Sequence, residues 1–282
     1  MPLNSESRAI RMVMTDVDGT LVTPEKDLTE QAKNAVSQIH AAGLKFTLIS
    51  SRPPYGMRSL VDELGVKIPI VAFNGGMLVT SDGQPMQSFR LRAELIPEIL
   101  DCLSRFGLAP RLYTPEQWLI PTLEHRHLQH EICTIEAEPI VAEDFTPYFQ
   151  QVYKITGVSD DVDAVDACLK ALQKTAAGQY LSVLCSQAYY LDITDVMANK
   201  GHAVTLMAEN QGMLSNEVAV IGDMPSDVPM FHAAGFSIAM GNASDTVKRE
   251  ATICTDSNTD EGFAKAMERY ILQTNRIVMG SA

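Results

Sequence analysis

The sequence predicts an α/β protein: a parallel β-sheet covered by helices on both faces, with a second α/β domain inserted into it. In the first and last thirds of the chain, short apolar runs alternate with helix-like segments. Nearly continuous apolar strands separated by helices are typical of a parallel sheet that is buried on both faces. The middle third differs, because prolines recur there between short β-like runs, which indicates a separate inserted domain.

The outer thirds of the chain supply the predicted parallel sheet. Helix 29–42 is the best defined element, because apolar residues recur at helical spacing between a possible N-cap at Thr29 and a stop at Gly43. Functional residues of such sheets gather at the carboxyl ends of the strands. The predicted strands are 10–14, 46–49, 68–73, 218–221 and 236–239, and the other predicted helices are 55–64, 227–234 and 260–273.

The middle third supplies the predicted inserted domain. We place the core domain at 1–84 and 190–282, and the inserted domain at 85–189. Its predicted helices are 93–106 and 161–176, and the β-like runs are 111–113, 152–156, 180–184 and 189–193.

Composition narrows the range of functions. A length of 282 residues with 46% hydrophobic residues is ample for a packed core. A net charge of −13 argues against a nucleic-acid partner, because phosphate backbones bind clustered Lys and Arg. The polar start of the sequence lacks the order of a signal peptide, and no apolar run is long enough to span a bilayer. Five scattered cysteines without a C-x-x-C pair are typical of reduced thiols. We therefore expect a cytoplasmic protein without a membrane partner.

Two aspartates, Asp16 and Asp18, follow the first predicted strand. Residues i and i+2 of an extended strand project to the same side, so we expect both carboxylates to share one pocket. Two close carboxylates repel unless a cation or a shared proton intervenes, which favours a metal-assisted reaction in which one attacks and the other handles a proton. An exposed Asp-Gly turn is the alternative. A calcium loop fits less well, since Gly19 stands fourth rather than sixth.

Other polar residues stand at or near the ends of the other predicted strands. Ser50 and Arg52 follow the second apolar run and offer a hydroxyl and a cation. Asp223 and Asp227 follow the strand at 218–221 and add two carboxylates. Lys200 lies just before the helix that precedes this strand. If the strands are parallel, these groups meet near one edge of the sheet.

At these residues the chain resembles the haloacid dehalogenase (HAD) superfamily of phosphatases, and specifically its Cof-like branch. The first family motif, Asp-x-Asp-Gly-Thr, is matched by Asp16 to Thr20. The segments at Asn74-Gly75, Lys200-Gly201, Asp223 to Asp227 and 239–243 match the remaining motifs. Ser51 and Ser226 depart from the usual Gly and Asn. The resemblance implies the HAD fold, a Rossmann-like parallel-sheet core with an inserted α/β cap.

The resemblance also implies a role for each matching residue. Asp16 is the expected nucleophile and Asp18 the expected general acid and base, with Ser50 and Lys200 assisting at the phosphoryl group. Mg²⁺ is expected on the Asp16 carboxylate, the Asp18 backbone carbonyl and Asp223, supported by Asp227. The remaining candidates, for substrate binding, are Arg52, Asn74, Gly75 and Asn242.

The expected function is Mg²⁺-dependent hydrolysis of small phosphorylated metabolites, such as sugar phosphates or phosphorylated cofactors, through an aspartyl-phosphate. The alternatives are a phosphomutase with the same intermediate and a non-catalytic sugar-phosphate sensor. We expect a monomer or a weak homodimer.

Two weaker sets of candidates lie in the predicted cap. Arg111, Trp118 and Arg126 are candidates for contact with substrate. The cluster of His125, His127 and His130 is expected to be part of a solvated cap segment rather than a metal site.

Overall fold

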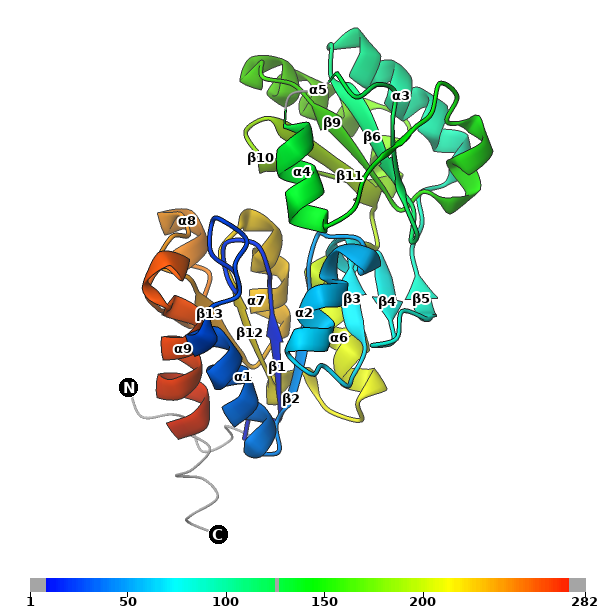
Figure 1. The fold of residues 1–282 in the computed structure, drawn as a ribbon. Coiled ribbons are helices and arrows are strands. Elements are labelled where there is room, and N and C mark those ends of the chain that lie inside the picture. Colours follow the sequence, from blue (N-terminus) through cyan, green and yellow to red (C-terminus); the bar gives the residue numbers. More distant parts are fainter. Residues whose placement is uncertain (1–8, 125–126, 274–282) are drawn as a thin grey trace. The chain divides into compact units, whose positions relative to one another are not determined.

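The computed structural model describes residues 9–124 and 127–273, and its elements are labelled in Figure 1. These residues form two compact units. The first comprises 9–50, 60–70 and 200–273, and the second comprises 51–59, 71–124 and 127–199. In this part of the chain no helix has the length and apolar character needed to cross a membrane.

The first unit is built on a five-stranded sheet with the strand order β14-β13-β12-β1-β2, in which every neighbouring pair is parallel. The three central strands are entirely buried except for one partly buried residue at the start of β13. This burial explains the continuous apolar runs in the sequence. The strands are β1 (Met12–Thr15), β2 (Lys45–Leu48), β12 (Val218–Gly222), β13 (Phe236–Ala239) and β14 (Ile253–Cys254).

Helices cover both faces of this sheet. The crossover from β1 to β2 runs through α1, and the crossover from β12 to β13 runs through α7 in the opposite direction along the sheet. Right-handed crossovers therefore place α1 and α7 on opposite faces (Figure 1), with α9 packed on α1 and α6 packed on α7. The helices are α1 (Glu30–Ala41), α2 (Arg58–Glu63), α6 (Lys200–Asn210), α7 (Val228–Ala233), α8 (Asp245–Lys248) and α9 (Gly262–Ala266).

The second unit contains a six-stranded mixed sheet with the order β10-β11-β9-β6-β7-β8 and a three-stranded sheet with the order β3-β4-β5. Its helices are α3 (Ile96–Arg105), α4 (Leu128–Ile135) and α5 (Val162–Lys174). The larger sheet consists of β6 (Ala109–Tyr113), β7 (Trp118–Ile120), β8 (Ile140–Val141), β9 (Lys154–Val158), β10 (Leu181–Gln187) and β11 (Tyr190–Asp195). The smaller sheet consists of β3 (Ile70–Ala72), β4 (Met77–Val79) and β5 (Pro85–Ser88).

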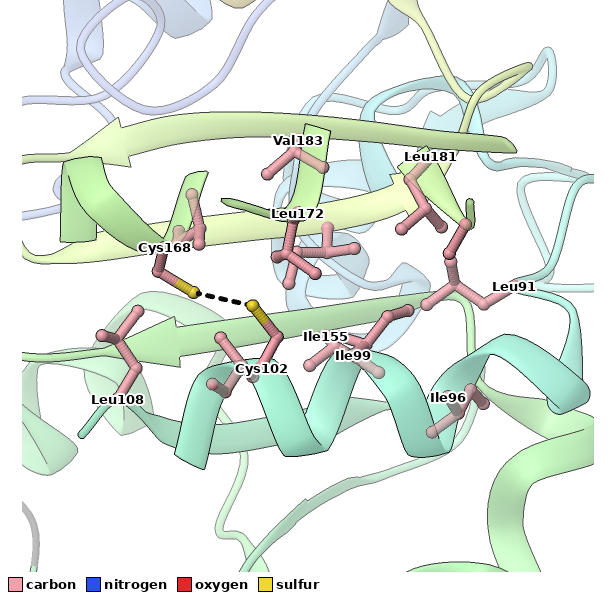
Figure 2. Packing of buried hydrophobic residues seen from close by; sticks show 14 of the residues in the cluster. Leu91, Ile96, Ile99, Cys102, Leu108, Ile155, Cys168, Leu172, Leu181 and Val183 are labelled. Carbon is pink, nitrogen blue, oxygen red and sulfur yellow. Dashed lines mark hydrogen bonds between the residues drawn. The ribbon is translucent and has the colours of Figure 1, made fainter. Parts of the chain in front are cut away.

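One face of the six-stranded sheet packs against α3 and α5 to form the hydrophobic core of the second unit (Figure 2). Ile155 of β9 and Ile99 of α3 are fully buried there. The sulfurs of Cys102 in α3 and Cys168 in α5 point toward each other at 3.9 Å in this core. All five cysteines are free thiols, as expected.

The opposite face of the same sheet is polar but also buried. Strand residues alternate between faces, so Leu112, Ile155 and Ile193 form one row across β6, β9 and β11 on the apolar side. The adjacent row consists of Arg111, Thr156 and Asp192 and lies on the other side. These three polar side chains are at most 4% exposed.

Most predicted strands and helices are confirmed to within a few residues, and the parallel α/β core is confirmed. One expectation about their arrangement is wrong. The strand predicted at 68–73 forms as β3, but it joins β4 and β5 rather than the parallel sheet. The helix predicted at 55–64 is confirmed, with the 3-10 helix Pro54–Met57 followed directly by α2. The sequence-based domain boundaries stay a prediction.

Short helices complete the chain. They include a π-helix at Met267–Leu272, which continues α9 within the predicted helix 260–273. The 3-10 helices are Pro54–Met57, Phe73–Gly75, Ala93–Leu95, Thr146–Gln151, Gly178–Tyr180, Ser215–Glu217, Pro225–Asp227 and Asn258–Asp260.

Candidate active site

The topology of the first unit brings two predicted acidic residues together. Strands β1 and β12 are neighbours, and the crossovers that follow them leave in opposite directions. Ligands of open α/β sheets bind at such a switch point, beyond the carboxyl ends of the strands. Asp16 follows β1 and donates its backbone N–H to Ile221 O of β12 at 2.9 Å, and Asp223 follows β12 directly.

Lys200 joins this pair from the first residue of α6. Its Nζ donates to Asp16 Oδ1 and to Asp227 Oδ1, each at 2.6 Å, and its side chain is 3% exposed. The next residue, Gly201, lets α6 approach α7 closely, since a Cβ there would lie 2.6 Å from Pro229 O. The close packing of the two helices therefore determines where the lysine reaches the carboxylates.

Both carboxylate oxygens of Asp227 accept hydrogen bonds from groups of the protein. Its Oδ2 accepts the backbone N–H groups of Asp223 and Met224, both at 2.9 Å, while Oδ1 accepts from Lys200. The residue has no solvent exposure. Asp227 therefore fixes the position of Lys200 relative to the loop after β12.

Asp223 is held by donors from two other segments. Thr20 Oγ1 donates to its Oδ1 at 2.9 Å, and Asn242 Nδ2 donates to its Oδ2 at 3.2 Å. Gly19 makes this close approach possible, because a Cβ there would lie 2.4 Å from Asp223 Oδ2 and the residue has φ +81°. The glycine and threonine of the first motif thus support the carboxylate at the end of β12.

Burial and like charge govern the electrostatics of this cluster. Burial, opposed by Lys200 and reinforced by Asp227, raises the pKa of Asp16 well above its ordinary value. Burial and the charge of Asp227 raise the pKa of Asp223 to about 7. Burial alone would lower the pKa of Lys200, but Asp16 and Asp227 together raise it. When all three carboxyls are ionised, the one lysine leaves an excess of negative charge, and the raised pKa values show that protons offset part of this excess.

This excess and its geometry suit a divalent cation. One carboxylate oxygen from each of Asp16, Asp223 and Asp227 lies within 4.8 Å of the others, and all three residues are buried. Hard cations such as Mg²⁺ prefer oxygen ligands and often bind through one or two carboxylates. The residues present therefore fit the metal site that the sequence predicts.

Asp18 lies near this cluster: after burial and the charge of Asp227, its charge also helps to raise the pKa of Asp223. That Asp16 and Asp18 share one pocket stays a prediction. Strand β1 ends at Thr15, and the N–H groups of Leu21 and Val22 both donate to Val17 O in the turn that follows. The carboxylate of Asp18 also pairs with Lys26 Nζ at 2.7 Å and is 27% exposed.

The other predicted site residues divide between the two units. Ser50 is buried in the first unit, two residues after the end of β2, which is the neighbour of β1. Arg52, Asn74 and Gly75 lie in the second unit. Arg52 donates to Gly56 O at 3.0 Å, and Asn74 is buried with φ +58° and no partner for Oδ1 among the described residues. Their contact with substrate stays a prediction.

Asn242 has a set of contacts that the sequence did not suggest. Besides Asp223, its Nδ2 donates to Gly19 O at 2.9 Å, and its Oδ1 accepts from the N–H of Asn258 at 3.1 Å. Asn258 in turn donates to Val22 O at 3.0 Å. These asparagines link the loop after β1 to the loop after β12, whereas binding of substrate by Asn242 stays a prediction.

Sequence reasoning assigned no role to Thr20, Lys26 or Asn258. The role of Thr20 could have been predicted, since this residue belongs to the first motif. The roles of Lys26 and Asn258 could not, because their contacts with Asp18 and Val22 depend on how separate loops fold together.

The weaker candidates lie in the second unit. Arg111 and Trp118 are buried there, with 1% and 0% exposure. His127 stacks on Tyr189 and contacts Asp160 at 2.9 Å. His125 and Arg126 lie outside the described residues.

Comparisons with known proteins identify the family. The family model for haloacid dehalogenase-like hydrolases matches residues 13–267. A 5-amino-6-(5-phospho-D-ribitylamino)uracil phosphatase of Bacillus subtilis is 26% identical, covering 93% of this chain and 98% of that protein. A pyridoxal phosphate phosphatase of Escherichia coli is 25% identical, covering 93% and 99%.

A solved structure shows the same fold. A haloacid dehalogenase-like hydrolase from Bacteroides thetaiotaomicron superposes with a TM-score of 0.83 at 27% identity, covering 92% of this chain and 99% of that one. The expected enzyme class, a phosphatase, is confirmed, and the chain belongs to the haloacid dehalogenase-like hydrolase family.

Proposed function

We propose that the chain is a Mg²⁺-dependent phosphatase of small phosphorylated metabolites that works through an aspartyl-phosphate on Asp16. The observation that carries this proposal is the buried cluster of three carboxylates around Lys200 at the switch point of the parallel sheet. Phosphoryl transfer requires mainly positioning and neutralisation of charge. A lysine and a divalent cation among these carboxylates supply both.

The metal would be held by Asp16 and Asp223, with the Asp18 backbone carbonyl as a further ligand. Asp227 supports the site indirectly, because its oxygens already accept from two backbone N–H groups and from Lys200. When bound, Mg²⁺ offsets the negative charge of the carboxylates and of the substrate phosphate. Burial raises the pKa values of Asp16 and Asp223, so Mg²⁺ must displace protons from these carboxyls when it binds.

In the first step, a carboxylate oxygen of Asp16 attacks phosphorus, and the bond from phosphorus to the leaving alcohol oxygen breaks. Lys200 donates to Asp16 Oδ1 and so leaves Oδ2 as the attacking atom. Asp18 gives its proton to the departing alcohol, which leaves neutral. Ser50, buried near the end of the strand next to β1, donates a hydrogen bond to a phosphoryl oxygen.

In the second step, Asp18 takes a proton from a water molecule that attacks the aspartyl-phosphate. The bond between Asp16 and phosphorus breaks, inorganic phosphate leaves, and the Asp16 carboxylate is restored. Asp18 suits both steps because it is less buried than Asp16, with a side chain 27% exposed against 8%. Its carboxylate can therefore exchange protons with alcohol and water.

Relatives that match over almost the whole chain support the proposed substrate class. Those proteins are named as phosphatases of a phosphorylated ribitylamino-uracil and of pyridoxal phosphate. Both compounds are small phosphate monoesters. We assign the same class, including sugar phosphates, to this chain.

Three further expectations stay predictions. They are the absence of a nucleic-acid partner, the cytoplasmic location and a monomeric or weakly dimeric state.

The test is a panel of phosphorylated metabolites scored by release of inorganic phosphate, with and without Mg²⁺. Turnover that needs Mg²⁺ is expected, and Asp16→Asn should lower it by at least about a thousandfold, because the nucleophile is lost. Asp166→Asn is the matched control, since Asp166 is an exposed aspartate on α5 that pairs with Lys170. Activity that survives in Asp16→Asn contradicts the proposal.

The panel also separates the two alternative functions. Transfer of phosphate to a second alcohol group without free phosphate would indicate a phosphomutase. Tight binding of a sugar phosphate with no metal-dependent release of phosphate would indicate a sensor.

A further inference from the structure

The loop after β1 contains an ion pair that the motifs of the sequence do not include. Lys26 Nζ donates to Asp18 Oδ1 at 2.7 Å, and the two side chains are only 20% and 27% exposed. Lys200 is likewise paired, but with Asp16 and Asp227. The proposed nucleophile and the proposed general acid thus each have a lysine partner of their own.

Lys26 is placed by a loop that is closed by its own hydrogen bonds. Thr23 N donates to Asp27 O and Lys26 N donates to Thr23 O, both at 3.0 Å, while Asp27 N donates to Thr23 Oγ1 at 3.2 Å. Inside this loop Lys26 has φ +73°. A lysine seldom adopts the left-handed region, and such residues concentrate where a function requires them.

The loop is also anchored to the rest of the candidate active site. Val22, which precedes Thr23, donates its N–H to Val17 O at 3.1 Å and accepts from Asn258 Nδ2 at 3.0 Å. Asn258 contacts Asn242, which contacts Asp223. The position of Lys26 is therefore coupled through hydrogen bonds to the same loops that hold the carboxylate cluster.

We propose that Lys26 is a positioning residue for the general acid: it holds the Asp18 carboxylate in the orientation from which the leaving alcohol receives its proton. This inference rests on the proposed function of Asp18. Lys26 acts through Asp18, to which it donates, and its contribution is the orientation of this carboxylate. A general acid contributes about 10²- to 10⁴-fold when it is well placed, so an incorrectly oriented carboxylate forfeits part of that factor.

The dependence on the leaving group tests this role. Nitrophenolate leaves as a stable anion and needs little protonation, whereas an alkyl alcohol such as glycerol needs a proton as it departs. The value of kcat/KM covers the steps up to departure of the alcohol. Lys26→Met should therefore lower kcat/KM for glycerol phosphate by about tenfold more than for p-nitrophenyl phosphate, a fraction of the general-acid factor.

Three variants make the test specific. Lys26→Arg keeps the cation and should restore most of the activity on glycerol phosphate. Lys26→Asn keeps a residue that tolerates the left-handed backbone but removes the cation, and should behave like Lys26→Met. Lys33→Met is the matched control, because Lys33 forms ion pairs with Glu30 and Glu63 elsewhere in the first unit.

The outcomes distinguish this inference from the proposed function. Equal losses on both substrates, no loss on glycerol phosphate, or a gain there would overturn the role of Lys26 while leaving the phosphatase intact. No Mg²⁺-dependent turnover of either substrate by the unmodified protein would instead overturn the proposed function.

Discussion

Each unit of the protein buries a cluster of charged side chains, but the two clusters differ in charge balance. In the first unit, Asp16, Asp223 and Asp227 surround Lys200. In the second unit, Arg111 pairs with Glu131 at 3.6 Å and Lys154 pairs with Asp192 at 3.9 Å. The first cluster has three carboxylates for one cation, whereas the second has two of each.

This difference shows which buried charges require a ligand. The second cluster neutralises itself and supplements its ion pairs with hydrogen bonds, such as Arg111 to Tyr190 at 2.9 Å and Thr156 to Asp192 at 2.7 Å. Pairing of this kind offsets the charge of buried ions, although the described partners of Arg111 do not include a hydrogen-bond acceptor for its buried Nε. The first cluster retains an excess of negative charge, and a metal ion would balance it. The candidate active site is therefore distinguished from the second cluster by its unbalanced charge, since both clusters bury charged side chains.

The largest expected effect is in the balanced cluster. Glu131→Gln should destabilise the second unit by about 3 kcal/mol, because it leaves Arg111 buried without its opposite charge. Gln can still accept the hydrogen bond from Tyr113, so the change isolates the charge. The measurement is urea unfolding followed by fluorescence of Trp118, the one tryptophan of the chain, which is buried in this unit.

Two controls make this prediction specific. Glu116→Gln removes an exposed carboxylate of the same unit and should leave the unfolding midpoint unchanged. Combining Arg111→Met with Glu131→Gln should recover much of the lost stability, because both charges are then absent. If the double variant is no more stable than Glu131→Gln alone, the ion pair is not the cause.

The second expected effect is the pH dependence of Mg²⁺ binding in the unbalanced cluster. The pKa of Asp223 is raised to about 7, so its carboxyl retains a proton below that pH and must lose it to bind metal. Mg²⁺ should therefore bind about 30-fold more weakly at pH 5.5 than at pH 8, from the 1.5 units between pH 5.5 and this pKa. Isothermal titration at the two pH values checks this.

The raised pKa of Asp223 also determines how the stability of the metal-free protein changes with pH. A carboxyl with a raised pKa in the folded state favours folding while it is protonated, and this contribution is lost as pH rises through its folded pKa. The metal-free first unit should therefore lose stability between about pH 4 and pH 7. Affinity for Mg²⁺ that stays constant from pH 5.5 to pH 8 would contradict both statements.

The third prediction is a gain in the free energy of unfolding, opposite to the loss expected for Glu131→Gln. Asp223→Asn should stabilise the metal-free protein by about 1 kcal/mol at pH 8, because relief of charge exceeds the loss of one accepted hydrogen bond. The amide can accept from Thr20 or from Asn242, but not from both with oxygen. Calorimetric unfolding in the presence of a chelator measures the gain. If Asp223→Asn instead destabilises the protein as much as Glu131→Gln does, the two clusters do not differ in charge balance as proposed.

The parts of the molecule that could be predicted from the sequence depend on local patterns. The apolar runs predicted the central strands, and Thr29 accepts from Ala32 N as the predicted N-cap of α1. Strand ends predicted that Asp16 and Asp223 come together, because parallel strands end at one edge of a sheet. The short strands β7 and β8 have no comparable pattern, since they are only three and two residues long.

The unpredicted parts depend on contacts between loops. The side chain of Asp18 could not be placed from strand periodicity, because β1 ends at Thr15 and the chain turns at Val17. The partner of Asp18 is Lys26, whose position depends on a left-handed backbone residue that no apolar pattern indicates. The charge balance of the second cluster likewise became visible only from the register of β6, β9 and β11 and from the contact of Glu131 of α4 with Arg111.

The smallest expected effect concerns Asn242, which is exposed but bridges Gly19 O and Asp223 Oδ2. Asn242→Ala should weaken Mg²⁺ binding by about threefold, since one exposed hydrogen bond to a charged group contributes little. Asn210→Ala, at the exposed end of α6, is the matched control. If Asn242 instead contacts substrate, as its sequence motif suggests, KM should rise while affinity for Mg²⁺ stays unchanged. The two measurements together therefore decide whether this asparagine belongs to the support of the unbalanced cluster or to the recognition of its ligand.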